Sequence, residues 1–68
     1  MTRDPRTDPQ PGDVLRGTHG VKRRVRQREG DWLFVGESRT RYRMRLAVWQ
    51  EWCERRAAEA VMVANQEE

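Results

Sequence analysis

The sequence predicts an α+β fold in which a three- or four-stranded antiparallel sheet is followed by one C-terminal helix. Between Asp13 and Met44, apolar and polar residues alternate, which is the period-two pattern of β-strands. From Leu46 onward the apolar residues recur at steps of three and four, which is typical of an amphipathic helix. The chain has 68 residues, which is enough for one domain with a thin core.

Four short segments carry the strand pattern, and three turns that contain glycine separate them. The predicted strands lie within Asp13–Thr18, Val21–Arg28, Trp32–Val35 and Arg39–Arg45. Glycine at 20, 30 and 36 favours these turns because it adopts positive φ without steric cost. The Trp32–Val35 segment is apolar on both faces, which is typical of a central strand covered on both sides. Strands joined in this order curl readily into a small SH3-like half-barrel or open sheet.

The helix is expected to run from Leu46 to about Ala64, because no proline or glycine interrupts this segment. Its apolar stripe consists of Leu46, Trp49, Cys53, Ala57, Ala60 and Ala64. We expect Trp49 and Cys53 to pack against Trp32 or Phe34 of the sheet. The remaining parts of the chain are a flexible or extended leader over residues 1–11, which contains three prolines, and a frayed tail over residues 65–68. Residues 12–64 then form the single domain.

Composition argues against several function classes. A single cysteine, Cys53, excludes an internal disulfide, and together with one histidine, His19, it is too few ligands for a structural zinc site. His19 follows the first strand in a turn and Cys53 lies on the helix stripe, so no nucleophile–base pair is apparent. We therefore expect a protein that is not an enzyme and uses no cofactor or metal. No apolar run reaches membrane-spanning length and no secretory signal is present, which together with the free thiol points to the cytoplasm.

Arginine dominates the strongest signal in the sequence. Between Arg16 and Arg45 there are ten basic residues against three acidic ones, a local balance of +7 within a chain of net charge +3. The candidate nucleic-acid- or partner-binding residues are Lys22, Arg24, Arg26 and Arg28 in the second predicted strand and Arg39, Arg41, Arg43 and Arg45 in the fourth. If these strands are neighbours, the alternation places about eight positive charges on one face. Nucleic-acid backbone, an acidic protein surface and a solvated polar face are the three interpretations of such a face.

The aromatic residues and the end of the helix suggest further contacts. Trp32, Tyr42 and Trp52 are placed to alternate with the arginines as stacking platforms for bases. Trp52 lies off the helix stripe, so it is either an edge residue of the core or an exposed anchor for a partner. The segment Ala60–Ala64 is apolar almost all round, which indicates either deep packing or a homodimer contact through the C-terminal helix.

The order of these motifs also resembles short uncharacterised proteins of phages and prophages. The resemblance rests on Pro11-Gly12-Asp13-Val14-Leu15, then Arg23-Arg24-Val25, then Gly30-Asp31, and a Trp-x-x-Trp spacing at Trp49 and Trp52. It covers about residues 11–60 and implies a compact SH3-like sheet with a terminal helix. It also implies an accessory role in DNA or RNA binding, or inhibition of a host nucleoprotein defence as in anti-CRISPR proteins.

Three functions follow as expectations. The first is nucleic-acid backbone binding through the arginine face, which salt-dependent binding to oligonucleotides would reveal. The second is a protein inhibitor of a host nucleoprotein complex that uses Trp52 as its anchor and binds naked oligonucleotides poorly. The third is a phage structural or assembly subunit, which would self-associate. Neither a membrane nor a small molecule is an expected partner.

Overall fold

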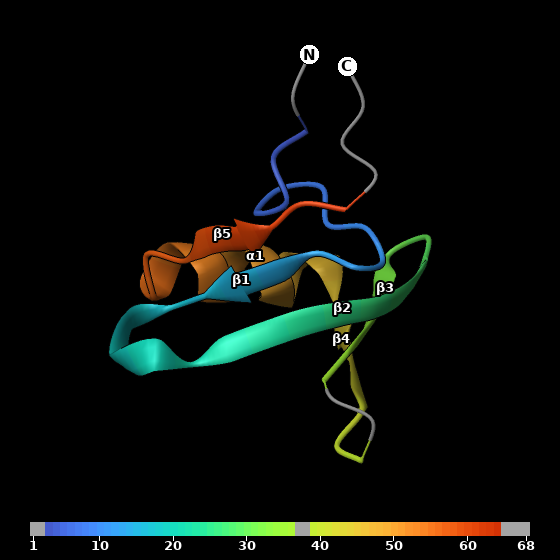
Figure 1. Ribbon diagram of the computed structural model, residues 1–68. Coiled ribbons are helices and arrows are strands. Elements are labelled where there is room, and N and C mark those ends of the chain that lie inside the picture. The colour runs from blue at the N-terminus through green and yellow to red at the C-terminus, as the bar shows by residue number, and fades with distance from the viewer. Residues whose placement is uncertain (1–2, 37–38, 65–68) are drawn as a thin grey trace.

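The computed structural model describes residues 3–36 and 39–64, and it confirms the α+β fold. Five antiparallel strands form one sheet in the order β4-β3-β2-β1-β5, and a helix connects β4 to β5 (Figure 1). The strands are β1 (Val14–Arg16), β2 (Lys22–Glu29), β3 (Trp32–Val35), β4 (Tyr42–Arg45) and β5 (Glu59–Met62), and the helix is α1 (Leu46–Arg55). The first four strands lie within the four predicted segments, except that β2 continues one residue further to Glu29, whereas β5 is additional.

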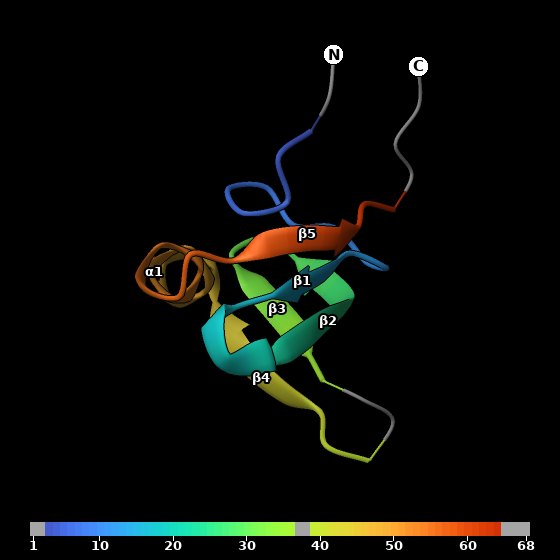
Figure 2. The same ribbon diagram turned by 60° about the vertical axis from the view of Figure 1, so that its left-hand side comes forward.

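The eight-residue strand β2 joins the two halves of the sheet. Its first half pairs with β1 and its second half pairs with β3, so the sheet curls around one core (Figure 2). The pairing with β3 shifts between Val25 and Gln27, which leaves Arg26 as the extra residue of a β-bulge. A bulge bends its strand and increases the local twist, which suits the place where the sheet turns.

The core lies between α1 and the concave face of the sheet. It contains Leu15, Val25, Leu33, Val35, Met44, Trp49, Trp52, Cys53 and Ala58, with Leu46 packed at its margin. Within β3, Leu33 and Val35 are fully buried, whereas Trp32 and Phe34 lie on the opposite face and are half-buried. The expectation that Trp49 and Cys53 pack against Trp32 or Phe34 is therefore wrong, because the other pair of β3 residues faces the helix.

The helix ends at Arg55, nine residues before the predicted end, although no glycine marks the stop. Ala57 adopts a left-handed φ of 49°, and its N–H donates to the Glu54 carbonyl. The Ala58 N–H donates to the Cys53 carbonyl, so the two bonds form a Schellman motif. Burial of Ala58 in the core offsets the strain at Ala57. The segment expected to form a helical homodimer contact is therefore the strand β5 and its continuation.

Replacing Ala57 with glycine is expected to stabilise the protein. Glycine adopts the left-handed conformation of this position without the Cβ clash, so the free energy of unfolding should rise by about 0.5–1 kcal/mol. Chemical denaturation of the parent and Ala57→Gly measures the change. Ala47→Gly, at an exposed position inside α1, is the matched control and should instead lose about 1 kcal/mol. If both variants lose stability equally, the strain assigned to Ala57 is absent.

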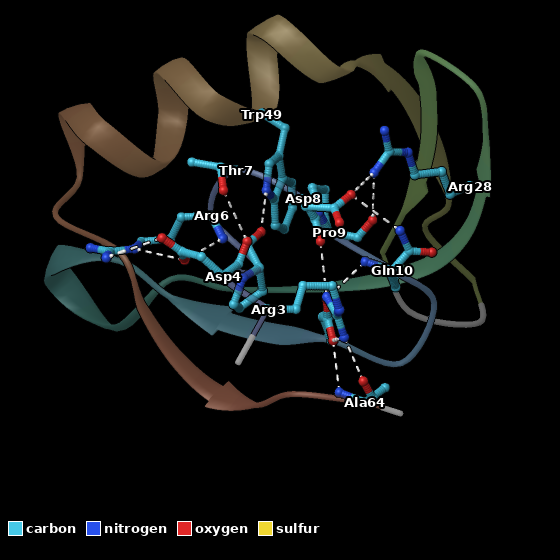
Figure 3. A network of polar contacts seen from close by, with 12 residues as sticks. Arg3, Asp4, Arg6, Thr7, Asp8, Pro9, Gln10, Arg28, Trp49 and Ala64 are labelled. Atoms are coloured by element: carbon cyan, nitrogen blue, oxygen red, sulfur yellow. Dashed lines mark hydrogen bonds and ion pairs between the residues drawn. The ribbon is translucent and has the colours of Figure 1, made fainter. Parts of the chain in front are cut away.

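Residues 3–11 fold back onto the core instead of extending away as a leader. The Trp49 indole Nε1 donates to the Pro5 carbonyl at 3.0 Å (Figure 3). The Gln50 side chain donates to the Thr7 carbonyl. Pro5 and Pro9 are buried. The prediction of little order before Pro11 failed because proline-rich composition does not show that a carbonyl in the segment accepts a buried indole N–H. The predicted tail, residues 65–68, lies outside the described residues.

Asp13 links this segment by hydrogen bonds to residues near both ends of the described chain. Its carboxylate is fully buried and accepts hydrogen bonds from the Arg3 guanidinium, the Gln10 backbone N–H and the Ala64 backbone N–H (Figure 3). Arg3 also donates to the Ala64 carbonyl. A buried charge is tolerated when it is paired and hydrogen-bonded, and Asp13 meets both conditions.

Candidate nucleic-acid interface

The two arginine-rich strands are not neighbours. β3 lies between β2 and β4, so the basic residues of β2 and β4 do not form one continuous ladder. The first half of β2, with Lys22 and Arg24, belongs to the part of the sheet that β1 and β5 complete. Arg43 and Arg45 belong to the part that β3 and β4 form. The predicted single face of about eight charges is therefore divided.

The bulge at Arg26 reverses which residues of β2 face outward. Before it, Arg23 is paired with the fully buried Leu15 and faces inward, so Lys22 and Arg24 face outward. After it, Arg28 is paired with the fully buried Leu33 and faces inward.

Arg28 is a structural residue in this arrangement. Its guanidinium donates to Asp8 at 2.6 Å and to the Pro9 carbonyl at 3.0 Å, so it holds the leader to the sheet (Figure 3). Strict alternation would place Arg28 on the same face as Arg24 and Arg26. The extra residue at the bulge turns Arg28 to the inner face instead.

The fourth strand follows the predicted alternation. Met44 is buried, so Arg43 and Arg45 project from the outer face, and Arg39 and Arg41 are exposed in the connection that precedes β4. The connection begins at Gly36, where φ is +123° and an added Cβ would lie 2.0 Å from the Thr40 carbonyl oxygen. Only glycine fits this close approach, so the loop that carries Arg39 and Arg41 depends on it.

Two aromatic side chains share the outer face with the β4 arginines. In the register, Trp32 is paired with Arg45, and Phe34 is paired with Arg43. The Arg43 and Arg45 guanidinium carbons lie 4.7 and 4.2 Å from the centre of the Trp32 ring. Trp32 was predicted as a stacking platform, whereas Phe34 was assigned to the core. Phe34 lies two residues after Trp32, so the alternation of the strand already placed the two rings on the same face.

Ion pairing is uneven on this face. Arg45 pairs with Asp31 at 3.2 Å, whereas Arg26, Arg41 and Arg43 form no ion pair within the described residues. We call Arg43, Trp32 and Phe34, together with the exposed Arg26 of the bulge and the exposed Arg41 of the connection before β4, the arginine–aromatic surface. It offers cations for phosphate and partly exposed rings for base stacking.

Trp52 is a core residue. Only 4% of it is exposed, and its ring centre lies 5.6 Å from that of Trp49. Of the two interpretations that the sequence left open, the structure supports the core position and contradicts the exposed anchor. Helix spacing placed Trp52 about 90° from the stripe, but a sheet that curls around α1 covers a wider arc than one stripe.

The two candidate reactive groups, Cys53 and His19, lie in different surroundings. Cys53 is buried, and burial raises the pKa of its thiol to about 11, so the thiol is protonated at neutral pH. His19 is exposed in the β1–β2 turn at a φ of 67°. Within residues 3–36 and 39–64, no group of three histidine, cysteine or carboxylate side chains is placed to hold a metal ion.

Comparisons with known proteins returned no relative. No family model, curated protein or solved structure matches the chain. In the part of the chain that the structure describes, the helix α1 is too short and too polar to cross a membrane.

Proposed function

We propose that this protein is a non-enzymatic accessory protein, of the phage or mobile-element type, that binds nucleic-acid backbone through the arginine–aromatic surface. The observation that carries the proposal is that Arg43, which is exposed and has no carboxylate partner among the described residues, shares one face with the partly exposed Trp32 and Phe34. Guanidinium groups bind phosphate oxygens, and the two rings offer sequence-tolerant stacking. Binding of this kind is weakly selective for sequence and falls steeply with salt.

The inhibitor alternative has less support. It used Trp52 as the exposed anchor of a protein–protein contact, and a residue that is 4% exposed is not accessible to a partner. Acidic protein surfaces remain chemically compatible with the same arginines. An inhibitor of a nucleoprotein complex would bind that complex tightly and oligonucleotides poorly, so the assay below separates the two functions.

One specific observation supports the self-association alternative. β5 is an edge strand of the sheet, and Val61 and Met62 on it are 50% and 55% exposed. An exposed apolar edge strand without proline or lysine is a template for pairing with another chain. A homodimer would then form through β5 and not through a helix, and light scattering would detect it.

Replacing Arg43 with glutamine is expected to weaken oligonucleotide binding more than the same change at Arg45. Both residues project from β4 against Trp32, but the charge of Arg45 is already offset by Asp31. For Arg43→Gln the slope of log affinity against log salt should become shallower by about 1, and for Arg45→Gln by less. Fluorescence anisotropy with labelled single-stranded DNA, duplex DNA and RNA over a salt series measures both slopes.

The parent protein and a leader variant complete this test. Arg6→Gln removes a cation that is paired with Asp4 at 3.3 Å, away from the β4 face, and should leave the slope unchanged. Equal losses for Arg6→Gln and Arg43→Gln would show that net charge, and not this surface, drives binding. Absence of binding to every oligonucleotide at low salt would refute the proposed function.

A further inference from the structure

A second arginine–aromatic cluster lies at the open end of the sheet, on the inner side. The Arg23 guanidinium carbon is 4.5 Å from the centre of the Trp52 ring and 5.7 Å from the centre of the Tyr42 ring. Arg23 is paired in register with the fully buried Leu15, so its side chain projects to the inner side of the sheet. Arg23 is half-buried there, so a permanent positive charge lies at the edge of the core.

The charge of Arg23 has no counter-ion among the described residues. The ion pairs of the described chain involve Arg3, Arg6, Arg28 and Arg45, and no described acceptor takes a hydrogen bond from Arg23. A guanidinium carries five N–H donors in its plane. Contact with the face of an aromatic ring stabilises the charge but leaves these in-plane donors unsatisfied. The edge of Arg23 is therefore available to an external acceptor.

The turn between β1 and β2 packs closely against this cluster. An added Cβ at Gly17 would lie 2.9 Å from the Arg56 Cβ and 3.3 Å from the Trp52 ring, so glycine allows these two side chains to approach the β1–β2 turn closely. The aliphatic part of the Arg56 side chain thus lies near the Trp52 ring, on which the Arg23 guanidinium stacks. Tyr42 is 43% exposed, so the cluster is open to solvent on that side.

We propose that this cluster, Arg23 with Trp52, Tyr42 and Arg56, is an anion site that takes a phosphate group, with Arg23 as its main ligand. The rings hold the planar fork of Arg23 in one orientation, which is the arrangement that favours two parallel hydrogen bonds to phosphate oxygens. The side-chain stem of Arg56 lies near Trp52, so a second arginine belongs to the neighbourhood of the site. The site is separate from the arginine–aromatic surface, because Tyr42 and Arg43 project to opposite sides of β4.

The test is a titration of the protein with sodium phosphate, followed by NMR at the arginine Nε–Hε and tryptophan indole signals. Sodium chloride at matched ionic strength is the reference. We expect the Arg23 and Trp52 signals to shift to saturation with phosphate and not with chloride. Arg23→Lys keeps the charge but loses the planar fork, so phosphate affinity should fall about tenfold. Arg43→Lys, on the other face, should leave the Trp52 shift unchanged.

Further titrations identify the source of the phosphate and the outcomes that refute the site. A 5′-phosphorylated dinucleotide that shifts Trp52 when its unphosphorylated form does not would assign a nucleic-acid end, whereas a response to inorganic phosphate alone would assign the free ion. Equal shifts with acetate, or shifts confined to Arg43 and Arg45, would overturn the proposal. Tyr42→Leu, at a largely exposed position, gives the second test if Arg23→Lys does not fold, and unchanged phosphate affinity in that variant also overturns it. None of these readouts depends on oligonucleotide binding by the outer surface.

Discussion

Replacing Trp49 with alanine is expected to leave most of the chain unfolded at room temperature. Trp49 is completely buried and its indole N–H donates to the Pro5 carbonyl, so the change removes one of the two tryptophans of the core and one hydrogen bond to the leader. Truncation of a buried tryptophan costs about 3–5 kcal/mol. The total stability of a domain this small is on the order of 5 kcal/mol. Circular dichroism during thermal melting measures the loss.

Trp52→Ala is expected to be almost as damaging. Trp52 packs against Trp49 and supports Arg23, and its exposed fraction of 4% makes it a core residue. Trp49→Phe is the informative control, because it keeps an aromatic ring in the core and removes the hydrogen bond to Pro5 with only part of the buried volume. That variant should fold with an intermediate melting temperature. Trp52→Ala melting like the parent protein would contradict the core position of Trp52.

The second large effect is expected at Asp13. Its replacement by alanine leaves the N–H groups of Gln10 and Ala64 without their acceptor and leaves Arg3 without its carboxylate. Removing one partner of a buried, hydrogen-bonded ion pair costs about 3–5 kcal/mol. Chemical denaturation should therefore show a loss close to the whole stability of the domain. Amide hydrogen exchange should rise first at Ala64 and Gln10.

Arg3→Met separates the two roles of Asp13. It removes the guanidinium but keeps the two backbone hydrogen bonds, so its loss should be about 1–3 kcal/mol. The buried Asp13 carboxylate then keeps the backbone N–H groups of Gln10 and Ala64 as its donors. If Arg3→Met destabilises the protein as much as Asp13→Ala, then the ion pair, and not the backbone acceptor, stabilises this end of the fold.

Periodicity was sufficient to predict the first four strands and the start of the helix. The alternation around Leu33 and Met44 places buried residues on one face, and the change of period at Leu46 coincides with the first residue of α1. These signals are local, because each strand or helix must bury one side of itself. The end of α1 carried no such signal. Ala57 has no intrinsic preference for positive φ, and only the burial of Ala58 and the pairing of β5 with β1 hold it there.

The candidate surface was predicted in part. Arg43 and Arg45 project outward as expected, because β4 is regular. Arg28 faces inward, because one extra residue at Arg26 changes the side of everything that follows it in β2. A bulge of this kind depends on how two strands fit together, so a single strand read by itself does not reveal it. The same limit applied to Trp52, whose burial depends on the curl of the whole sheet.

The junction at Asp13 has a consequence for attachment and display. Arg3 and Ala64, near the two ends of the described chain, meet there, whereas the connection between β3 and β4 leaves the sheet on the opposite side (Figure 1). Immobilising the protein on a sensor chip by either end would thus turn Arg41 and Arg43 toward the solution. The same proximity makes a circular permutant feasible, with the ends joined by a short linker and the chain opened at the exposed β2–β3 turn at Gly30.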